Sequence, residues 1–265
     1  MRIVLSICLL AWMGQLSAQA SFDITPKKHF KEKKVLSYPA LDERDVFWEK
    51  KVYRIIDTRQ KINLPFRYPA QPLIQILEEG ITNGEVQAYA PGAEMFDHPL
   101  DSETLQRTFA TLDTVRVIQP DGTEEWIPIE NRLNYEDVHR YRIAEIWYFD
   151  SQSSTLKVRI MGIAPLKNEV DEWGNFLYET PMFWVHVPSA RSFLARYTVM
   201  NPHNQADQLS WEQYLERRQF EGYVYKEDNL HDRRLQDYLS GVDLLSEAEQ
   251  IDASIFSWES DLWSR

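Results

Sequence analysis

The sequence predicts an α+β protein with a central antiparallel or mixed sheet flanked by helices, and with extended N- and C-terminal tails. Three observations support this class: strand patterns gather in the middle of the chain, helix patterns lie before and after them, and no unit of roughly 20–50 residues repeats. Helices alternating strictly with strands would instead predict a parallel sheet. We expect one main domain over residues 41–225.

The composition is that of a folded, acidic protein. The chain has 265 residues, of which 43% are apolar and 13% aromatic, which is enough to build a core without disulfides or metals. Asp and Glu number 41 against 29 Lys and Arg, a formal charge of −12. Because phosphate backbones are bound through clustered Lys and Arg, this balance argues against a nucleic-acid-binding protein.

Residues 1–20 have the pattern of a secretory signal peptide. Arg2 is followed by an apolar run over residues 3–13 and by the small-residue site Ala18-Gln19-Ala20. Cleavage after Ala20 would remove the single cysteine, Cys8, which excludes disulfides and thiolate chemistry in the exported chain. Since Cys8 lies within the apolar run, we do not expect a lipid anchor there.

Residues 21–40 form a basic N-terminal arm. They contain five lysines and two acids, a net charge of +3, and their apolar residues follow no period. Two interpretations stay open for this arm, a solvated leader and a segment that docks on an acidic partner.

The main domain begins with three predicted helices and one short strand. Apolar residues recur at i, i+4, i+7 and i+8 over residues 48–56, which predicts the first helix. Pro72 begins the second, which ends near residues 83–84, and residues 85–90 form a short strand. Asp101 or Ser102 begins the third, whose apolar face extends to Leu112.

Strands dominate the centre. Residues 141–149 and 156–163 predict the best pair, because the second alternates apolar and charged side chains while the first is apolar on both faces. Weaker strand patterns occupy residues 115–118 and 126–129, with a turn signal at 120–122, and residues 176–187. Two further helices follow, one starting at Pro188-Ser189 and one capped by Ser210 with Gln213.

Residues 226–265 form an acidic C-terminal tail that also holds aromatic and aliphatic residues. Ten acids and four bases give it a net charge of −6. An acidic segment with bulky apolar side chains is typical of a tail that a partner orders. The alternative is a helix packed on its own domain, for which Ser246 and Glu249 would supply a capping box.

Motifs for nucleophilic, phosphate-binding and metal chemistry are absent from the sequence. It contains no nucleophile elbow, no Walker loop and no Gly-x-Gly-x-x-Gly, and its six histidines are far apart. We therefore expect no catalytic residues, no cofactor and no metal site. His186 is interpreted as one face of a strand.

Two groups of carboxylates leave an enzymatic alternative open. Glu145 shares a strand face with apolar residues, where its pKa could rise enough for a general acid, but pairing with Arg140, Arg142 or Arg159 is the preferred interpretation. A glycan site could also form from acids beside an aromatic turn, namely Asp171, Glu172 and Glu179.

Tryptophan is abundant for a chain of this size. Nine tryptophans and thirteen tyrosines occur, and such residues are enriched at protein interfaces because they give a large contact area at a low entropy cost. They also stack on sugars, so a glycan-binding module is the competing interpretation.

Several segments, in order, resemble the GldN/PorN family of gliding motility and type IX secretion. The N-terminal signature is Glu43-Arg44-Asp45-Val46-Phe47-Trp48, followed by residues 54–59 and 61–69. The likeness continues through residues 84–89, 146–150, 159–165, 182–185, 190–191, 201–202 and 229–233. It therefore covers about residues 40–235, and the basic arm and most of the C-terminal tail lie outside this best-matching region.

The resemblance implies a non-enzymatic periplasmic protein at the outer membrane. It implies a ring built by self-association together with a GldK/PorK-like outer-membrane lipoprotein, and an engagement with a GldM/PorM-like periplasmic domain of the motor complex. Membrane contact would then be indirect, through the lipoprotein. The alternative function is a periplasmic glycan-binding or peptidoglycan-lytic protein that uses acids such as Glu145.

Overall fold

The computed structural model describes residues 35–92, 96–118, 124–171, 173, 175–201 and 209–263. The predicted signal peptide, most of the basic arm and the turn signal at residues 120–122 lie outside these residues.

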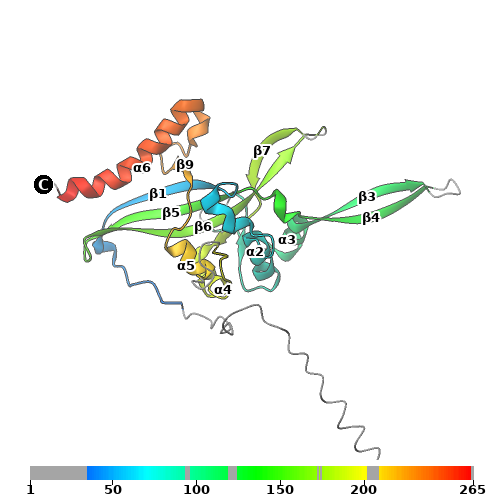
Figure 1. Cartoon of the computed structure of the whole chain (residues 1–265), viewed down its shortest axis with the longest axis horizontal. Coiled ribbons are helices and arrows are strands. Elements are labelled where there is room, and N and C mark those ends of the chain that lie inside the picture. Colours follow the sequence, from blue (N-terminus) through cyan, green and yellow to red (C-terminus); the bar gives the residue numbers. More distant parts are fainter. Residues whose placement is uncertain are drawn as a thin grey trace, which may run out of the picture. The chain divides into compact units, whose positions relative to one another are not determined.

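Seven strands of the described chain form one antiparallel sheet (Figure 1). Its order is β2-β8-β6-β5-β1-β9, and β7 also pairs with β6. The strands are β1 (Val46–Asp57), β2 (Ala88–Tyr89), β5 (Arg140–Asp150), β6 (Thr155–Val170), β7 (Phe176–Pro181), β8 (Trp184–His186) and β9 (Tyr223–Glu227). With helices around this sheet, the predicted α+β class is confirmed.

The helix predicted over residues 48–56 is wrong, because these residues belong to strand β1. Trp48, Val52 and Ile56 are spaced by four, a spacing that places them on one face of a helix and equally on one face of a strand. Pairing decides the outcome, since β1 lies between β5 and β9. Ile55 is buried as well, because both faces of the strand are covered here.

The predicted strand pair in the centre is confirmed as β5 and β6. All of β5 pairs with β6, from Arg140 opposite Leu166 to Asp150 opposite Thr155. The register shifts by one residue beside Glu145, which marks a β-bulge. The connecting loop is organised by the Asp150 carboxylate, which accepts hydrogen bonds from Gln152 N (3.0 Å) and Lys157 Nζ (2.6 Å).

A second, two-stranded sheet confirms the weaker strand patterns and lengthens them. Strand β3 (Ala110–Ile118) pairs with β4 (Glu124–Arg132) along its whole length. Helix α3 (Ser102–Phe109) precedes β3 and is capped by Asp101, whose side chain accepts from Thr104 N. The prediction that this helix reaches Leu112 is wrong, because Leu112 pairs with Glu130 in the hairpin.

The strand predicted over residues 176–187 is divided into β7 and β8. Pro181 ends β7, since it has no N–H to continue a ladder. Met182 N then donates to Pro165 O (2.9 Å), and Phe183 is fully buried before β8 begins. The strand predicted at residues 85–90 is shorter than expected, because only Ala88–Tyr89 pairs, with β8.

The remaining helices of the main domain agree with the sequence patterns. Helix α2 (Leu73–Thr82) follows Pro72, and α4 (Val187–Leu194) has a proline in its first turn. Helix α5 (Trp211–Glu216) has the predicted capping box, in which Ser210 and Gln213 exchange hydrogen bonds between side chain and backbone. Their apolar side chains form one large core cluster with Phe66, Tyr141 and Ile143.

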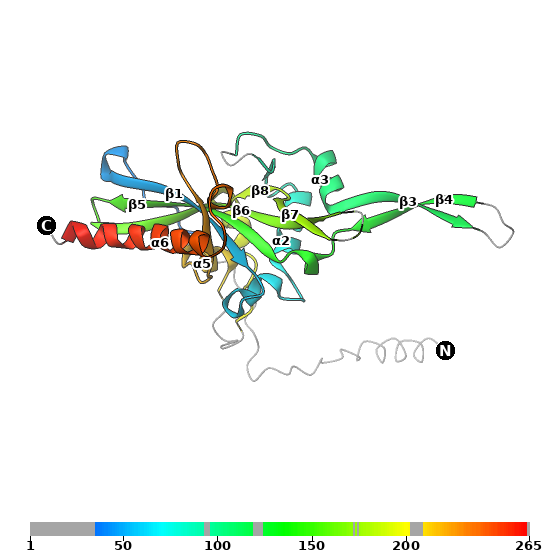
Figure 2. The ribbon, with the colours of Figure 1, turned by 90° about the horizontal axis from the view of Figure 1, so that it is seen from above.

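A second apolar cluster covers the other half of the same sheet face. Alternate residues of β1 join the two clusters, since Val52 lies in the smaller one and Ile56 in the larger one. Figure 2 shows α2, α5 and α6 on the same side of β1 and β5. The smaller cluster consists of Val52, Trp147, Val224, Leu235, Ala248, Ile251 and Ile255.

The C-terminal segment forms helix α6 (Gly241–Trp263), which packs on its own domain. Ile251 and Ile255 are buried against Val52 and Trp147. Of the two interpretations of this segment, the structure therefore supports the packed helix. The capping box expected at Ser246 is wrong, because that residue lies inside the helix.

Candidate functional site

Glu145 lies in a buried ionic cluster between the two apolar clusters. Its side chain is fully buried, and Arg54 of β1 is only 4% exposed. Arg54 Nε donates to Glu145 Oε2 (2.9 Å), and Trp147 Nε1 donates to the same oxygen (3.0 Å). The other carboxylate oxygen accepts from Arg218 Nε (2.8 Å).

Arg54 also connects the sheet to helix α6. Its Nη1 donates to Asp252 Oδ2 (2.8 Å), and its Nη2 is paired with the second carboxylate oxygen. Burial opposes the charge of Arg54, but the hydrogen bonds and charges of Asp252 and Glu145 outweigh it and raise the pKa of the guanidinium. The cluster thus joins β1, β5, α6 and the segment after α5.

Arg218 reaches Glu145 through an unusual backbone conformation. Its φ is 48°, in the left-handed region, where a non-glycine residue is uncommon. This conformation follows the end of α5, and the guanidinium lies 5.2 Å from the Trp147 ring centroid and 5.3 Å from that of Phe220. Cation–π contact and the ion pair with Glu145 together offset the backbone strain.

The prediction that Glu145 is structurally paired is confirmed, but the expected partners were wrong. Arg140 pairs with Asp57 and Glu179, Arg142 lies over the Tyr225 ring, and Arg159 lies over the Tyr38 ring. The true partners are 91 residues before and 73 residues after Glu145 in the sequence, so no local signal could identify them. Both oxygens of this buried carboxylate are engaged by side chains of the same chain, so the arrangement supports a structural role for Glu145 rather than that of a general acid.

Of the acids predicted near the aromatic turn, the two that the structure describes, Asp171 and Glu179, are engaged by different partners. Asp171 accepts from Trp173 N (2.9 Å) and Asn175 N (2.7 Å), and so closes the β6–β7 loop. Glu179 pairs with Arg140 at 3.1 Å. Glu172 lies outside the described residues.

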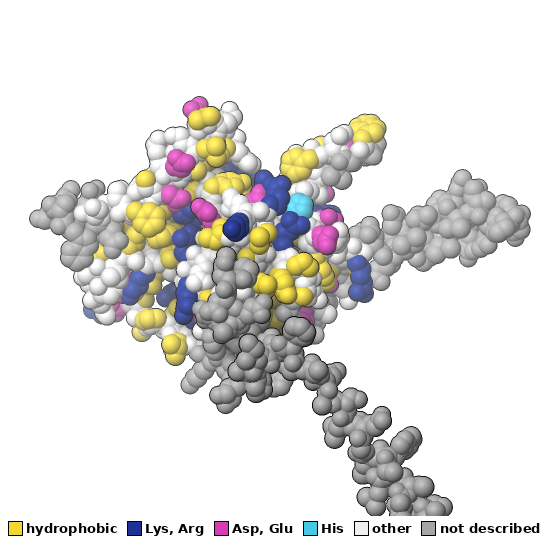
Figure 3. Space-filling view, viewed as in Figure 1, with side chains coloured by type: hydrophobic (Ala, Val, Ile, Leu, Met, Phe, Trp, Pro, Cys, Tyr) yellow, Lys and Arg dark blue, Asp and Glu magenta, His cyan; other side chains and the backbone are white. Residues whose placement is uncertain are grey.

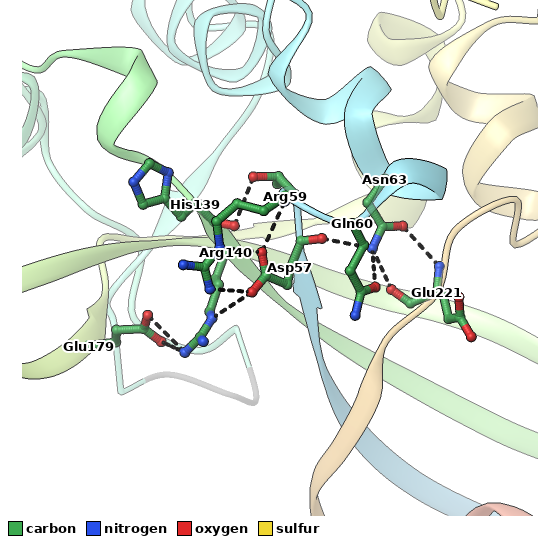
Figure 4. A network of polar contacts seen from close by, with 9 residues as sticks. Asp57, Arg59, Gln60, Asn63, His139, Arg140, Glu179 and Glu221 are labelled. Carbon is green, nitrogen blue, oxygen red and sulfur yellow. Dashed lines mark hydrogen bonds and ion pairs between the residues drawn. The ribbon is translucent and has the colours of Figure 1, made fainter.

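A polar network surrounds the end of β1, as Figure 4 shows. Asp57 accepts from Arg59 and Arg140, and a hydrogen bond from Arg59 is the largest of several causes that hold the pKa of the Asp57 carboxyl far below its usual range. Asn63 donates to Asp57 O (2.9 Å) and Glu221 O (2.8 Å), while its Oδ1 accepts from Glu221 N (2.9 Å). These contacts hold the 3₁₀ helix η3 (Lys61–Arg67) against β1 and the segment that precedes β9.

Metal chemistry has no support within the described ranges. No group of three or more His, Cys, Asp or Glu side chains suited to a metal occurs among the residues that the structure describes. His186 ends β8; its Nδ1 lies 2.6 Å from Ser189 Oγ, and burial lowers the pKa of its imidazole.

Two apolar surfaces of the described chain are exposed, and neither belongs to the buried ionic cluster. A groove of about 650 Å³ is lined by Leu64, Tyr68, Pro72, Tyr135 and Met200 among others. The β6–β7 hairpin exposes four large side chains, and Figure 3 shows hydrophobic side chains there. They are Trp173 (83% exposed), Phe176 (59%), Leu177 (55%) and Tyr178 (60%). The sequence predicts an aromatic turn beside Asp171, which includes Trp173, but periodicity does not show that the side chains of this hairpin stay outside the core.

None of the helices in the described part of the chain combines the length and the apolar character that are needed to cross a bilayer.

The fold and its surfaces define the class of this protein. It is an α+β protein in which the buried charges of Arg54 and Glu145 are paired with each other, and in which a hairpin and a groove expose some of the apolar side chains. The model of the family described as gliding motility associated protein GldN matches residues 41–264, and the chain belongs to this family. The match includes α6, so the expectation that the C-terminal tail lies outside the family resemblance is wrong. No curated protein matches this chain.

Proposed function

We propose that this protein is a non-enzymatic periplasmic subunit of the gliding motility and type IX secretion apparatus. In this proposal it forms a ring with a GldK/PorK-like outer-membrane lipoprotein and engages the periplasmic part of a GldM/PorM-like motor protein. Membership of the GldN family over residues 41–264 is the observation that carries the proposal.

The described surface supports a role in protein assembly. Aromatic and aliphatic side chains on a projecting hairpin are typical of a surface that another protein covers, since monomeric proteins rarely expose contiguous apolar patches. The glycan-lytic alternative is weakened because Glu145 is buried in ion pairs and Glu179 is held by Arg140.

Affinity purification from solubilised cell envelopes tests this function. A tagged full-length copy is expected to recover a lipoprotein of the GldK/PorK type and a GldM/PorM-like protein. The matched control is the same tagged chain without residues 1–20, which should remain inside the cell and recover neither. Recovery of neither partner by the full-length copy would refute the proposal.

A further inference from the structure

The β6–β7 hairpin continues past the end of the main sheet. The pairing of β5 with β6 ends at Arg140 opposite Leu166, whereas β6 runs on to Val170 with β7 as its partner. Figure 1 shows this two-stranded part projecting from the sheet. Two strands alone are marginally stable in water, so a hairpin that also exposes Trp173 and Tyr178 lacks the apolar cover that strands usually need.

The outer edge of β7 is open to pairing. Among the strands that the structure describes, β7 pairs only with β6. Phe176 lies opposite Val170 and Tyr178 opposite Glu169, so Leu177 is the extra residue of a bulge and stays outside this ladder. The strand has no lysine and no proline before Pro181, the residues that commonly block an edge. An extended segment could therefore add to this edge through main-chain hydrogen bonds.

The charge of the hairpin selects a basic segment. Residues 166–181 contain four acids, Glu169, Asp171, Glu172 and Glu179, and one base, Lys167, which lies 3.9 Å from Glu169, so the hairpin has a net charge of −3. Residues 27–34 of the same chain contain five lysines and one glutamate, a net charge of +4. Opposite charges on the two segments favour their encounter, and lysines can also contact the faces of exposed aromatic rings.

The point from which the basic segment leaves the domain is fixed by Tyr38. The Tyr38 ring lies 4.0 Å from the guanidinium carbons of both Arg159 and Arg191, and its hydroxyl donates to Glu216 Oε1 (2.6 Å). Residues 21–34 precede the described chain and would span at most roughly 50 Å if fully extended. This length allows an anchored arm to reach a neighbouring molecule.

We propose that the open edge of β7, with Trp173, Phe176, Leu177 and Tyr178, binds the lysine-rich residues 27–34 of a second copy of this chain. The inference rests on the proposed function in one respect, the self-association of subunits. Donor and acceptor occupy different places on one chain, so the contact is head-to-tail and can continue from copy to copy, as a ring requires.

Cysteine cross-linking tests this contact, because residues 21–265 contain no native cysteine. Two variants of that chain, Lys31→Cys and Tyr178→Cys, are mixed and oxidised, with a size tag on one of them. The control pairs Lys31→Cys with Leu245→Cys, which places a cysteine at a 55% exposed position on the acidic helix α6. We expect about tenfold more mixed dimer with Tyr178→Cys than with Leu245→Cys, because the docked arm raises the local thiol concentration. High salt should reduce the difference.

Three outcomes would overturn the inference. The first is an equal yield of mixed dimer with Leu245→Cys and with Tyr178→Cys. The second is a predominance of disulfides between two copies of the Tyr178→Cys variant, which would indicate pairing between hairpins. The third is a Lys31→Cys/Tyr178→Cys double variant that cross-links only within one chain at every concentration. Replacing the other four lysines of residues 27–34 by glutamate in the Lys31→Cys variant should abolish its cross-link to Tyr178→Cys without unfolding the described domain. If the envelope purification still recovers both partners while cross-linking fails, the proposed function stands and only this inference is lost.

Discussion

Replacing Glu145 by Gln is expected to destabilise the protein by about 3 kcal/mol. The substitution keeps the size of a fully buried side chain but leaves Arg54 and Arg218 without their shared carboxylate. Breaking a buried ion pair by removing one partner costs roughly 3–5 kcal/mol. The lower end applies here because Arg54 keeps Asp252, and because Gln can still accept one hydrogen bond. At roughly 2–4 °C per kcal/mol for a chain of this size, the unfolding midpoint should fall by about 6–12 °C.

Equilibrium urea unfolding, followed by circular dichroism and tryptophan fluorescence, measures this loss. Asp42→Asn is the control, because Asp42 forms its ion pair with Arg44 at a surface where their side chains are 48% and 88% exposed. The control should change the free energy of unfolding by less than about 0.5 kcal/mol. A loss below about 1 kcal/mol for Glu145→Gln would show that the cluster does not stabilise the junction as its burial implies.

Three further predictions concern helix α6, a helical glycine and a loop carboxylate. Ile255→Ala should lower the free energy of unfolding by about 2–5 kcal/mol, because Ile255 is fully buried. Leu245→Ala, at a 55% exposed position, is the control and should change this free energy little. Equal effects of the two variants in urea unfolding would mean that α6 is not packed on the sheet. Gly80→Ala should destabilise by about 1–3 kcal/mol although alanine favours helices, because its Cβ would lie 2.6 Å from the Phe193 ring. Gly92→Ala is the control, since no described atom lies within 4 Å of the position of its Cβ. A more stable Gly80→Ala in thermal unfolding would contradict the close packing. The pKa of Asp150 is lowered to about 2, and a hydrogen bond from Lys157 is the largest cause. The Asp150 carboxylate therefore stabilises the fold at a pH above its unfolded pKa of about 3.8, and this contribution is lost as the pH falls towards 2. In Lys157→Met the NMR-detected pKa of Asp150 should rise towards its ordinary value, and an unchanged pKa would refute this cause.

Local patterns were reliable where one segment decides its own structure. The capping box at Ser210 and the proline start of α2 depend on neighbours within a few residues, and both are present in the structure. The central pair β5–β6 also follows from its sequence, since a polar loop joins two strands of compatible pattern. The helix predicted over residues 48–56 is wrong because the apolar spacing of strand β1 (Val46–Asp57) fits a helix and a strand alike.

The sequence by itself determined the α+β class, the acidic charge, the lack of recognisable catalytic motifs and the likeness to the GldN family. Only the tertiary structure decided the partners of Glu145, because Arg54 and Arg218 approach it from distant segments. It also decided that α6 covers the sheet and that the apolar side chains of the β6–β7 hairpin remain exposed. Periodicity shows which residues of a segment share a face, but the packing of all elements determines which faces are covered.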